Sequence, residues 1–159
     1  MRGASSLLSL LLMLIGGSPA GTAGGIKTVT FAILMASALA TVSGRDDAVM
    51  FNRTVSKHAV GKAVAVTGIF LMIAFAAALL LEVLTGSDFL DVLFEAVSAT
   101  ATVGLTRGLT DTLGAPGKLV LIVTMFLGRV GPISLFIALN TNKKKSGSVR
   151  YPTEQINVG

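Results

Sequence analysis

Residues 88–105 read Asp-Phe-Leu-Asp-Val-Leu-Phe-Glu-Ala-Val-Ser-Ala-Thr-Ala-Thr-Val-Gly-Leu, and they give the strongest indication of how the chain is folded. Its first part has acids at 88, 91 and 95 and apolar side chains at 89, 90, 93, 94 and 97, which is helical spacing with Asp88 near the N-cap. A helix of about 13 residues is too short to cross a bilayer. The small, flexible segment Thr102-Val-Gly-Leu follows it. A short helix followed by a glycine-containing strand predicts a re-entrant pore loop.

Long apolar segments flank this stretch on both sides. Ala63 to Leu81 is 19 residues without a charge, and Leu119 to Leu139 is 21 residues interrupted only by Arg129. Each segment is long enough to cross about 30 Å of hydrocarbon as an α-helix. The order of span, short helix, extended segment and span predicts one complete pore repeat in residues 61–140.

The alternative for residues 88–101 is an amphipathic helix that lies on the membrane surface. Such helices favour Lys and Arg on the polar face, whereas this one carries Asp and Glu, so the pore loop is favoured. In a pore loop, rings of backbone carbonyls replace the hydration oxygens of K+, and a glycine permits the dihedral angles that this requires. The predicted ion selectivity filter consists of Thr102, Val103, Gly104 and Leu105.

A third apolar segment, in residues 1–43, is interrupted in its middle. Residues 4–15 are too short to span, residues 16–25 are rich in glycine, and residues 26–42 are apolar again apart from Lys27. We expect one broken membrane helix, whose break faces a pore or a packed interior because lipid cannot satisfy freed backbone groups. The break could act as a gate or be a static kink. The residues of this gate loop are Gly16, Gly17, Ser18, Pro19, Gly21, Thr22, Gly24 and Gly25.

Two other interpretations of this N-terminal segment are disfavoured. A signal peptide in residues 1–16 would need a clean small-x-small processing site and a polar mature domain, and another apolar segment follows instead. A phosphate-binding loop would need adjacent Gly and Lys, but Ile26 separates Gly25 from Lys27.

Arg129 lies in the middle of an apolar run, where a guanidinium costs about 2.5–3.5 kcal/mol on insertion scales. We therefore expect its side chain to point into the protein interior and to bind carbonyls freed by the glycine-rich break. A packing arginine unrelated to conduction is the alternative. Gly128, Gly131 and Pro132 beside it predict a close helix approach and a local kink.

The composition excludes most soluble functions. The chain of 159 residues is 52% hydrophobic and only 13% charged, and its mean hydropathy is +0.80, which is typical of a membrane protein. It has no Cys, a single His (His58) and no carboxylate pairs within the spans, so no enzyme chemistry and no bound metal or cofactor are predicted. Nucleic-acid binding is disfavoured because the cations flank apolar runs and aromatic residues are few.

Loop charges predict the orientation of the spans. The connection in residues 44–60 and the tail in residues 141–159, which contains Lys143, Lys144 and Lys145, are basic and should be cytoplasmic. The triple lysine is typical of an anchor to anionic lipid. Five acids against two bases lie in residues 82–118, which should therefore lie outside.

Four blocks resemble the Trk/Ktr/HKT superfamily of potassium transporters, and most closely the membrane subunit of Ktr-type K+ uptake systems. They are residues 12–28, residues 93–106, residues 125–132 and the final segment from Arg150 to Gly159. Together they span nearly the whole chain in the order of the family.

The resemblance implies an all-α integral membrane protein of a bacterial plasma membrane, built from four repeats of span, re-entrant pore helix and span. Residues 1–43 resemble the end of the third repeat, with a gate loop, and residues 61–140 resemble the complete fourth repeat. Gly104 is then the fourth filter glycine, Arg129 the latch that holds the gate loop, and Gly159 a dimer contact. The implied partners are K+, either alone or linked to Na+, a second copy of the subunit, and a cytosolic regulatory subunit that binds ATP or ADP.

The sequence departs from this family pattern in two ways. Three of the four filter segments are absent, so we expect a C-terminal fragment of a full transporter. A non-conducting membrane fragment or an interaction subunit is the alternative function. Arg107 stands just beyond the filter, where a cation should depress cation entry.

Overall fold

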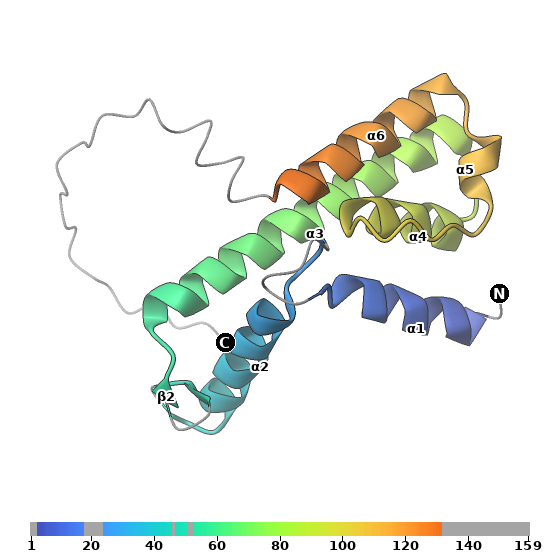
Figure 1. The fold of residues 1–159 in the computed structure, drawn as a ribbon. Helices are drawn as coiled ribbons and strands as arrows, with labels where there is room; N and C mark the ends of the chain where they lie inside the picture. The colour runs from blue at the N-terminus through green and yellow to red at the C-terminus, as the bar shows by residue number, and fades with distance from the viewer. Residues whose placement is uncertain (1–2, 18–23, 46, 51–52, 132–159) are drawn as a thin grey trace, which may run out of the picture.

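The computed structural model describes residues 3–17, 24–45, 47–50 and 53–131, which are mostly helical, as the all-α prediction requires (Figure 1). Its elements are α1 (Gly3–Leu14), α2 (Thr28–Val42), β1 (Val49–Met50), β2 (Arg53–Thr54), α3 (Lys57–Thr85), α4 (Phe89–Thr100), α5 (Leu109–Thr112) and α6 (Ala115–Val130). The four apolar or amphipathic segments predicted from the sequence therefore all form helices.

The long helix α3 is the axis on which the other helices pack. It has 29 residues, or about 44 Å at the α-helical rise, and it begins four residues before the predicted repeat boundary at residue 61. Ser56 caps its start by accepting a hydrogen bond from the Ala59 N–H at 3.2 Å, and Gly86, at φ 58°, ends it in the left-handed conformation. Within the described residues, α3 is the one helix long and apolar enough to cross a membrane.

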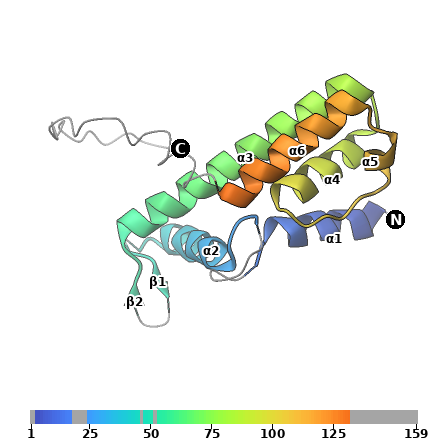
Figure 2. The same cartoon turned by 45° about the horizontal axis from the view of Figure 1, so that its top comes forward.

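Helices α4 and α6 pack together against the C-terminal half of α3, and Figures 1 and 2 show this three-helix cluster from two sides. Leu81 of α3 and Val92 of α4 are completely buried in the cluster, and Leu121 of α6 is nearly so. The α3 face at this contact carries Ala77 and Ala78, whose small side chains let the helices approach closely. This cluster fixes the position of α4, after which the predicted filter begins.

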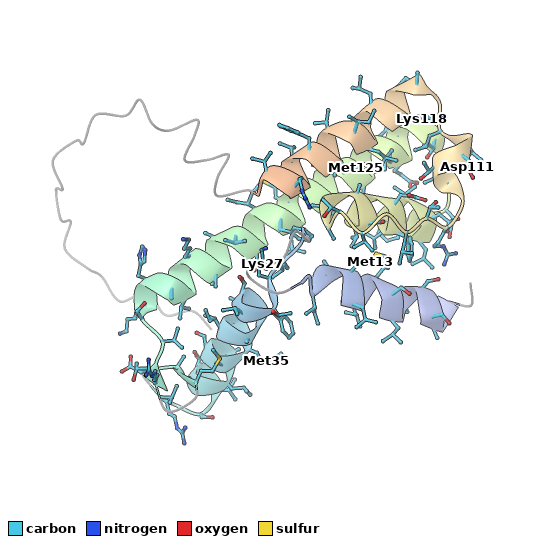
Figure 3. The ribbon with its side chains drawn as sticks, viewed as in Figure 1. Met13, Lys27, Met35, Asp111, Lys118 and Met125 are labelled. Atoms are coloured by element: carbon cyan, nitrogen blue, oxygen red, sulfur yellow. The ribbon has the colours of Figure 1, made fainter. Side chains whose placement is uncertain are left out.

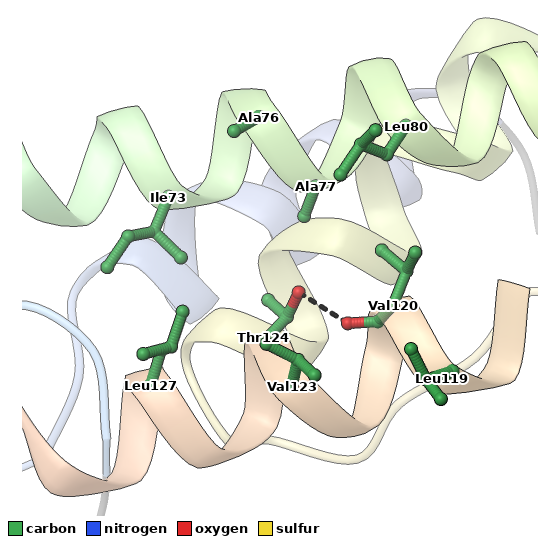
Figure 4. A pocket seen from close by; sticks show the side chains of 9 residues that line it. All are labelled: Ile73, Ala76, Ala77, Leu80, Leu119, Val120, Val123, Thr124 and Leu127. Carbon is green, nitrogen blue, oxygen red and sulfur yellow. Dashed lines mark hydrogen bonds between the residues drawn. The ribbon is translucent and has the colours of Figure 1, made fainter. Parts of the chain in front are cut away.

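Helix α6 begins at Ala115, four residues before the span that was predicted to start at Leu119. Pro116 lies in its first turn, where a backbone N–H would have no partner within the helix, so its absence costs nothing. The rest of that predicted span, after Gly131, lies outside the described residues. An apolar groove of about 320 Å³ lies between α3 and α6 and is lined by side chains of both helices (Figure 4). The Thr124 hydroxyl in this groove donates to the Val120 carbonyl at 2.8 Å, so its polar group is satisfied within the helix.

The broken helix runs antiparallel to α3, with α1 beneath α4 and α2 along the N-terminal half of α3. Leu10 and Met13 of α1 are buried against Phe94 and Val97 of α4, and Met13 lies between the two helices in Figure 3. By contrast, α2 has no buried residue. Its apolar surface therefore remains available to lipid or to further protein.

A short hairpin, β1–β2, lies in the predicted cytoplasmic connection and pairs Val49 with Thr54 and Met50 with Arg53. We did not predict it, because strands of two residues carry no detectable periodicity. The hairpin and the α5 region lie at opposite ends of α3 (Figures 1 and 2). Asp111 and Lys118 mark the α5 end in Figure 3. The basic and the acidic connections are thus separated along the helix axis.

Candidate functional site

The predicted filter begins where α4 ends, in a left-handed turn. The Thr102 N–H donates to the Ala99 carbonyl at 3.1 Å and the Val103 N–H donates to the Ser98 carbonyl at 3.0 Å, which is the Schellman pattern of helix termination. Thr102 has φ 54° and is the one non-glycine residue with positive φ in the part of the chain that the structure describes. Gly104 follows at φ 80°. The segment is therefore not the simple extended strand that the sequence suggested.

The glycine-rich break contacts this turn directly. The Gly24 N–H donates to the Thr102 hydroxyl oxygen at 2.9 Å, although the two residues are 78 positions apart. A Cβ atom at Gly24 would lie 2.9 Å from the Ala101 carbonyl oxygen, so a side chain there would push the two segments apart. This hydrogen bond also helps to hold Thr102 in a conformation that costs an L-residue about 1–2 kcal/mol. The predicted gate loop and the predicted filter are thus neighbours.

The backbone segments before and after the glycine-rich break are hydrogen-bonded to each other. The Gly16 N–H donates to the Ile26 carbonyl at 2.8 Å, the Thr28 N–H donates to the Gly17 carbonyl at 3.3 Å, and Ile15 and Ile26 form an isolated parallel bridge. A Cβ atom at Gly16 would overlap the Gly24 carbonyl oxygen, so this position needs glycine. Of the predicted gate residues, Ser18, Pro19, Gly21 and Thr22 lie outside the described residues.

Arg129 lies in the last turn of α6 beside the predicted filter. A pocket of about 400 Å³ is lined by Ser98 and by three filter residues on one side and by α6 on the other. Its lining residues are Ser98, Thr102, Val103, Gly104, Met125, Phe126 and Arg129. Arg129 and Gly24 of the predicted gate loop therefore both lie beside the turn at Thr102. A direct contact between Arg129 and the loop stays a prediction.

Gly128, next to Arg129, makes the close approach that the sequence suggested. It is buried, and a Cβ atom there would overlap the Thr100 carbonyl oxygen and lie 2.8 Å from its carbonyl carbon. Thr100 is the last residue of α4, two positions before the filter. The packing of α6 against the end of α4 thus depends on the absence of a side chain at Gly128.

The polar contacts that join α4 to the residues after the predicted filter were not predicted from the sequence. Glu95 of α4 is only 4% exposed, and its carboxylate accepts hydrogen bonds from Thr106, from the Arg107 N–H at 3.3 Å and from the Thr110 hydroxyl at 2.8 Å. A signal was present in the sequence, because Asp91 and Glu95 are four residues apart and so share one helix face.

The expectation that Arg107 depresses cation entry needs correction. Its guanidinium forms an ion pair with Asp91 and donates to the hydroxyl of Ser6 on α1. Because the pair has no net charge, Arg107 does not act as an isolated cation at the filter mouth.

The predictions for the dimer contact and for bound metal concern other parts of the chain. Gly159, the predicted dimer contact, lies outside the described residues. Among the described residues there is no group of three or more His, Asp and Glu side chains that could hold a metal ion.

Comparison with known proteins gives one family. The family model described as TrkH, cation transport protein, matches residues 2–149. The chain is similar to the Ktr system potassium uptake protein B of Bacillus subtilis (38% identity over 159 residues, 100% of this chain and 35% of the relative) and of Vibrio alginolyticus (38% over 153 residues, 96% and 33%). It is also similar to the potassium/sodium uptake protein NtpJ of Enterococcus hirae (36% over 166 residues, 100% and 36%). The chain spans about a third of the length of these curated relatives. Because the family model covers nearly all of its residues, the chain belongs to the TrkH family of cation transport proteins.

Proposed function

We propose that this chain is part of a K+ uptake transporter, in which residues 102–105 supply one of several filter segments that together surround the ion. The observation that carries the proposal is the turn after α4, where Thr102 and Gly104 both have positive φ and the gate loop donates a hydrogen bond to Thr102. The printed names of the relatives, which are potassium or potassium/sodium uptake proteins, support K+ as the transported ion.

In this proposal the chain lies in a bacterial plasma membrane as two units. Residues 1–43 form a broken span with a gate loop, residues 61–140 form a pore repeat in which α4 is the re-entrant pore helix, and residues 44–60 and 141–159 are cytoplasmic. Val103 and Leu105 are 44% and 46% exposed, which suits a segment that further filter segments would cover. A second copy of the subunit and a cytosolic nucleotide-binding regulatory subunit are the proposed partners, and no enzymatic step is involved.

The test is uptake of Rb+, a K+ substitute, into a bacterium that lacks its own K+ transport. Two proteins should be compared: this chain, and the form that includes any in-frame coding sequence upstream of Met1, which we call the extended form. We expect saturable uptake by the extended form with competition by K+. Insertion into the membrane without uptake by either form would instead support the alternative, a non-conducting or interaction subunit.

Arg129→Ala in the extended form is expected to raise Rb+ flux by about twofold, because removing the cation beside Thr102 should release the gate loop. Initial uptake rates, normalised to the amount of protein in the membrane, measure the effect. Lys118→Ala is the matched control, since it removes an exposed cation from the first turn of the same helix. An Arg129→Ala protein with normal abundance and normal kinetics would contradict the latch.

Deleting residues 19–23 is also expected to raise flux, by about twofold, if the gate loop obstructs the pore. The base of the loop should survive this deletion because its three backbone contacts involve Ile15, Gly16, Gly17, Ile26 and Thr28. The measurement is again the normalised initial rate of Rb+ uptake. Unchanged or lower flux from a protein of normal abundance would argue for a static kink.

A further inference from the structure

We infer that Glu95 is a positioning residue for ion selectivity, which holds the downstream end of the filter through hydrogen bonds to residues 106–110. The inference deepens the proposed function and rests on it. It assigns a role to a buried acid that the proposed path of the ion does not itself use.

The geometry that supports this role lies on both sides of the filter. Upstream, the backbone bonds from Thr102 and Val103 to the last turn of α4 fix where the filter begins. Downstream, Glu95 receives the hydroxyl of Thr106 and the N–H of Arg107, which lie two and three residues after Gly104. Since Glu95 belongs to the same helix, α4 holds both ends of the segment.

A buried carboxylate is well suited to this task. Burial of the group is costly unless donors surround it, and hydrogen bonds to an ionised acceptor are about twice as strong as neutral ones. Glu95 has two hydroxyl donors and one backbone donor, and both carboxylate oxygens are used. The contact therefore holds the loop in one position rather than in several.

A second acid one turn earlier strengthens the same attachment. Asp91 binds the Arg107 guanidinium, which also reaches Ser6, a fully buried residue of α1. The backbone of Arg107 is thus held by Glu95 and its side chain by Asp91. A carbonyl filter distinguishes ions by the number and spacing of its oxygens. A loosely held backbone at Arg107 should therefore lower the preference for K+ over Na+.

The experiment uses the extended form with Glu95→Gln, Thr106→Val and Thr106→Ser, and measures Rb+ uptake together with its inhibition by K+ and by Na+. Glu95→Gln removes the charge with little change of shape. Thr106→Val removes the hydroxyl that donates to Glu95 and that also accepts from the Gly108 N–H at 2.9 Å. We expect each to lower the preference for K+ over Na+ by about fivefold. Thr106→Ser keeps the donor and should remain within about twofold of the unsubstituted protein.

Two further variants separate positioning from general stability. Asp88→Asn removes an exposed acid at the N-cap of the same helix, which makes no side-chain capping bond, and should leave the ion preference unchanged. The double variant of Glu95→Gln with Thr106→Val should lose less than the sum of the two single variants, because both substitutions disturb the bond between Glu95 and Thr106.

The possible outcomes are distinguishable. If Thr106→Val behaves like Thr106→Ser, or if Glu95→Gln lowers only the maximal rate or the abundance with normal Na+ competition, Glu95 is structural and the inference is overturned. If the unsubstituted extended form takes up no Rb+, the proposed function fails first and the inference fails with it.

Discussion

Gly128→Ala in the extended form is expected to reduce Rb+ uptake by tenfold or more, measured relative to the protein present in the membrane. The added methyl group would overlap the Thr100 carbonyl oxygen, and backbone of this kind cannot move aside as a flexible side chain can. Overpacking at such a site costs about 3 kcal/mol, and 1.4 kcal/mol already corresponds to tenfold in an equilibrium. Either α6 or the end of α4 must shift, and the predicted filter begins two residues after Thr100.

Gly61→Ala is the control for this prediction. Gly61 also lies within a helix, but a Cβ atom there would have no neighbour within 4 Å. Alanine has the higher helix propensity, so this change should leave uptake intact and stabilise the protein slightly. Thermal unfolding of both variants in detergent separates the cases: we expect a lower midpoint for Gly128→Ala alone. Equal uptake by both variants would mean that α6 does not contact α4 at Gly128.

Gly104→Ser is expected to lower the preference for K+ over Na+ by about tenfold. Here the cause is conformational and not steric, because a Cβ atom at Gly104 would find open space within the chain. The residue has φ 80°, a conformation that costs an L-residue about 1–2 kcal/mol, so serine should pull the filter backbone toward negative φ. Competition of Na+ and K+ against Rb+ uptake gives the ratio.

Gly86→Ser is the control that distinguishes a specific change in ion preference from a general loss of stability caused by backbone strain. Gly86 has φ 58° and also has open space for a Cβ atom, but it caps α3 far along the chain from the filter. Both variants should lose similar stability, whereas only Gly104→Ser should change ion preference. Unchanged Rb+ uptake kinetics and Na+ competition in Gly104→Ser would exclude Gly104 as a filter glycine.

The helices were predictable because each has a clear local signal. The helix predicted for residues 88–101 is observed at Phe89–Thr100, with Asp88 as N-cap, although its side chain makes no capping bond. Uninterrupted apolar runs gave α3 and the part of α6 that the structure describes. Their ends were less predictable, because Ser56 and Pro116 extend these helices beyond the apolar runs from which we estimated their length.

Contacts between distant residues were predictable only in outline. The pairing of Gly24 with Thr102 depends on how α1 and α2 pack against α3 and α4, and no local pattern encodes it. The positive φ of Thr102 was also hidden, since threonine seldom adopts it without outside support. Arg107 led to a wrong electrostatic expectation because its partner, Asp91, lies 16 residues away in sequence. By contrast, Gly128 beside Arg129 correctly signalled the close helix contact.

The bond between Arg107 and Ser6 has a consequence for exchanging segments between members of this family. Ser6 lies in the broken helix, whereas Arg107 belongs to the loop after the filter, so one guanidinium joins two segments that the sequence pattern assigns to separate repeats. A chimera that exchanges residues 61–140 between relatives would therefore keep the contacts of Arg107 with Asp91 and Glu95 but lose its bond to Ser6 of the donor protein. A graft that preserves this bond would include α1 together with residues 61–140.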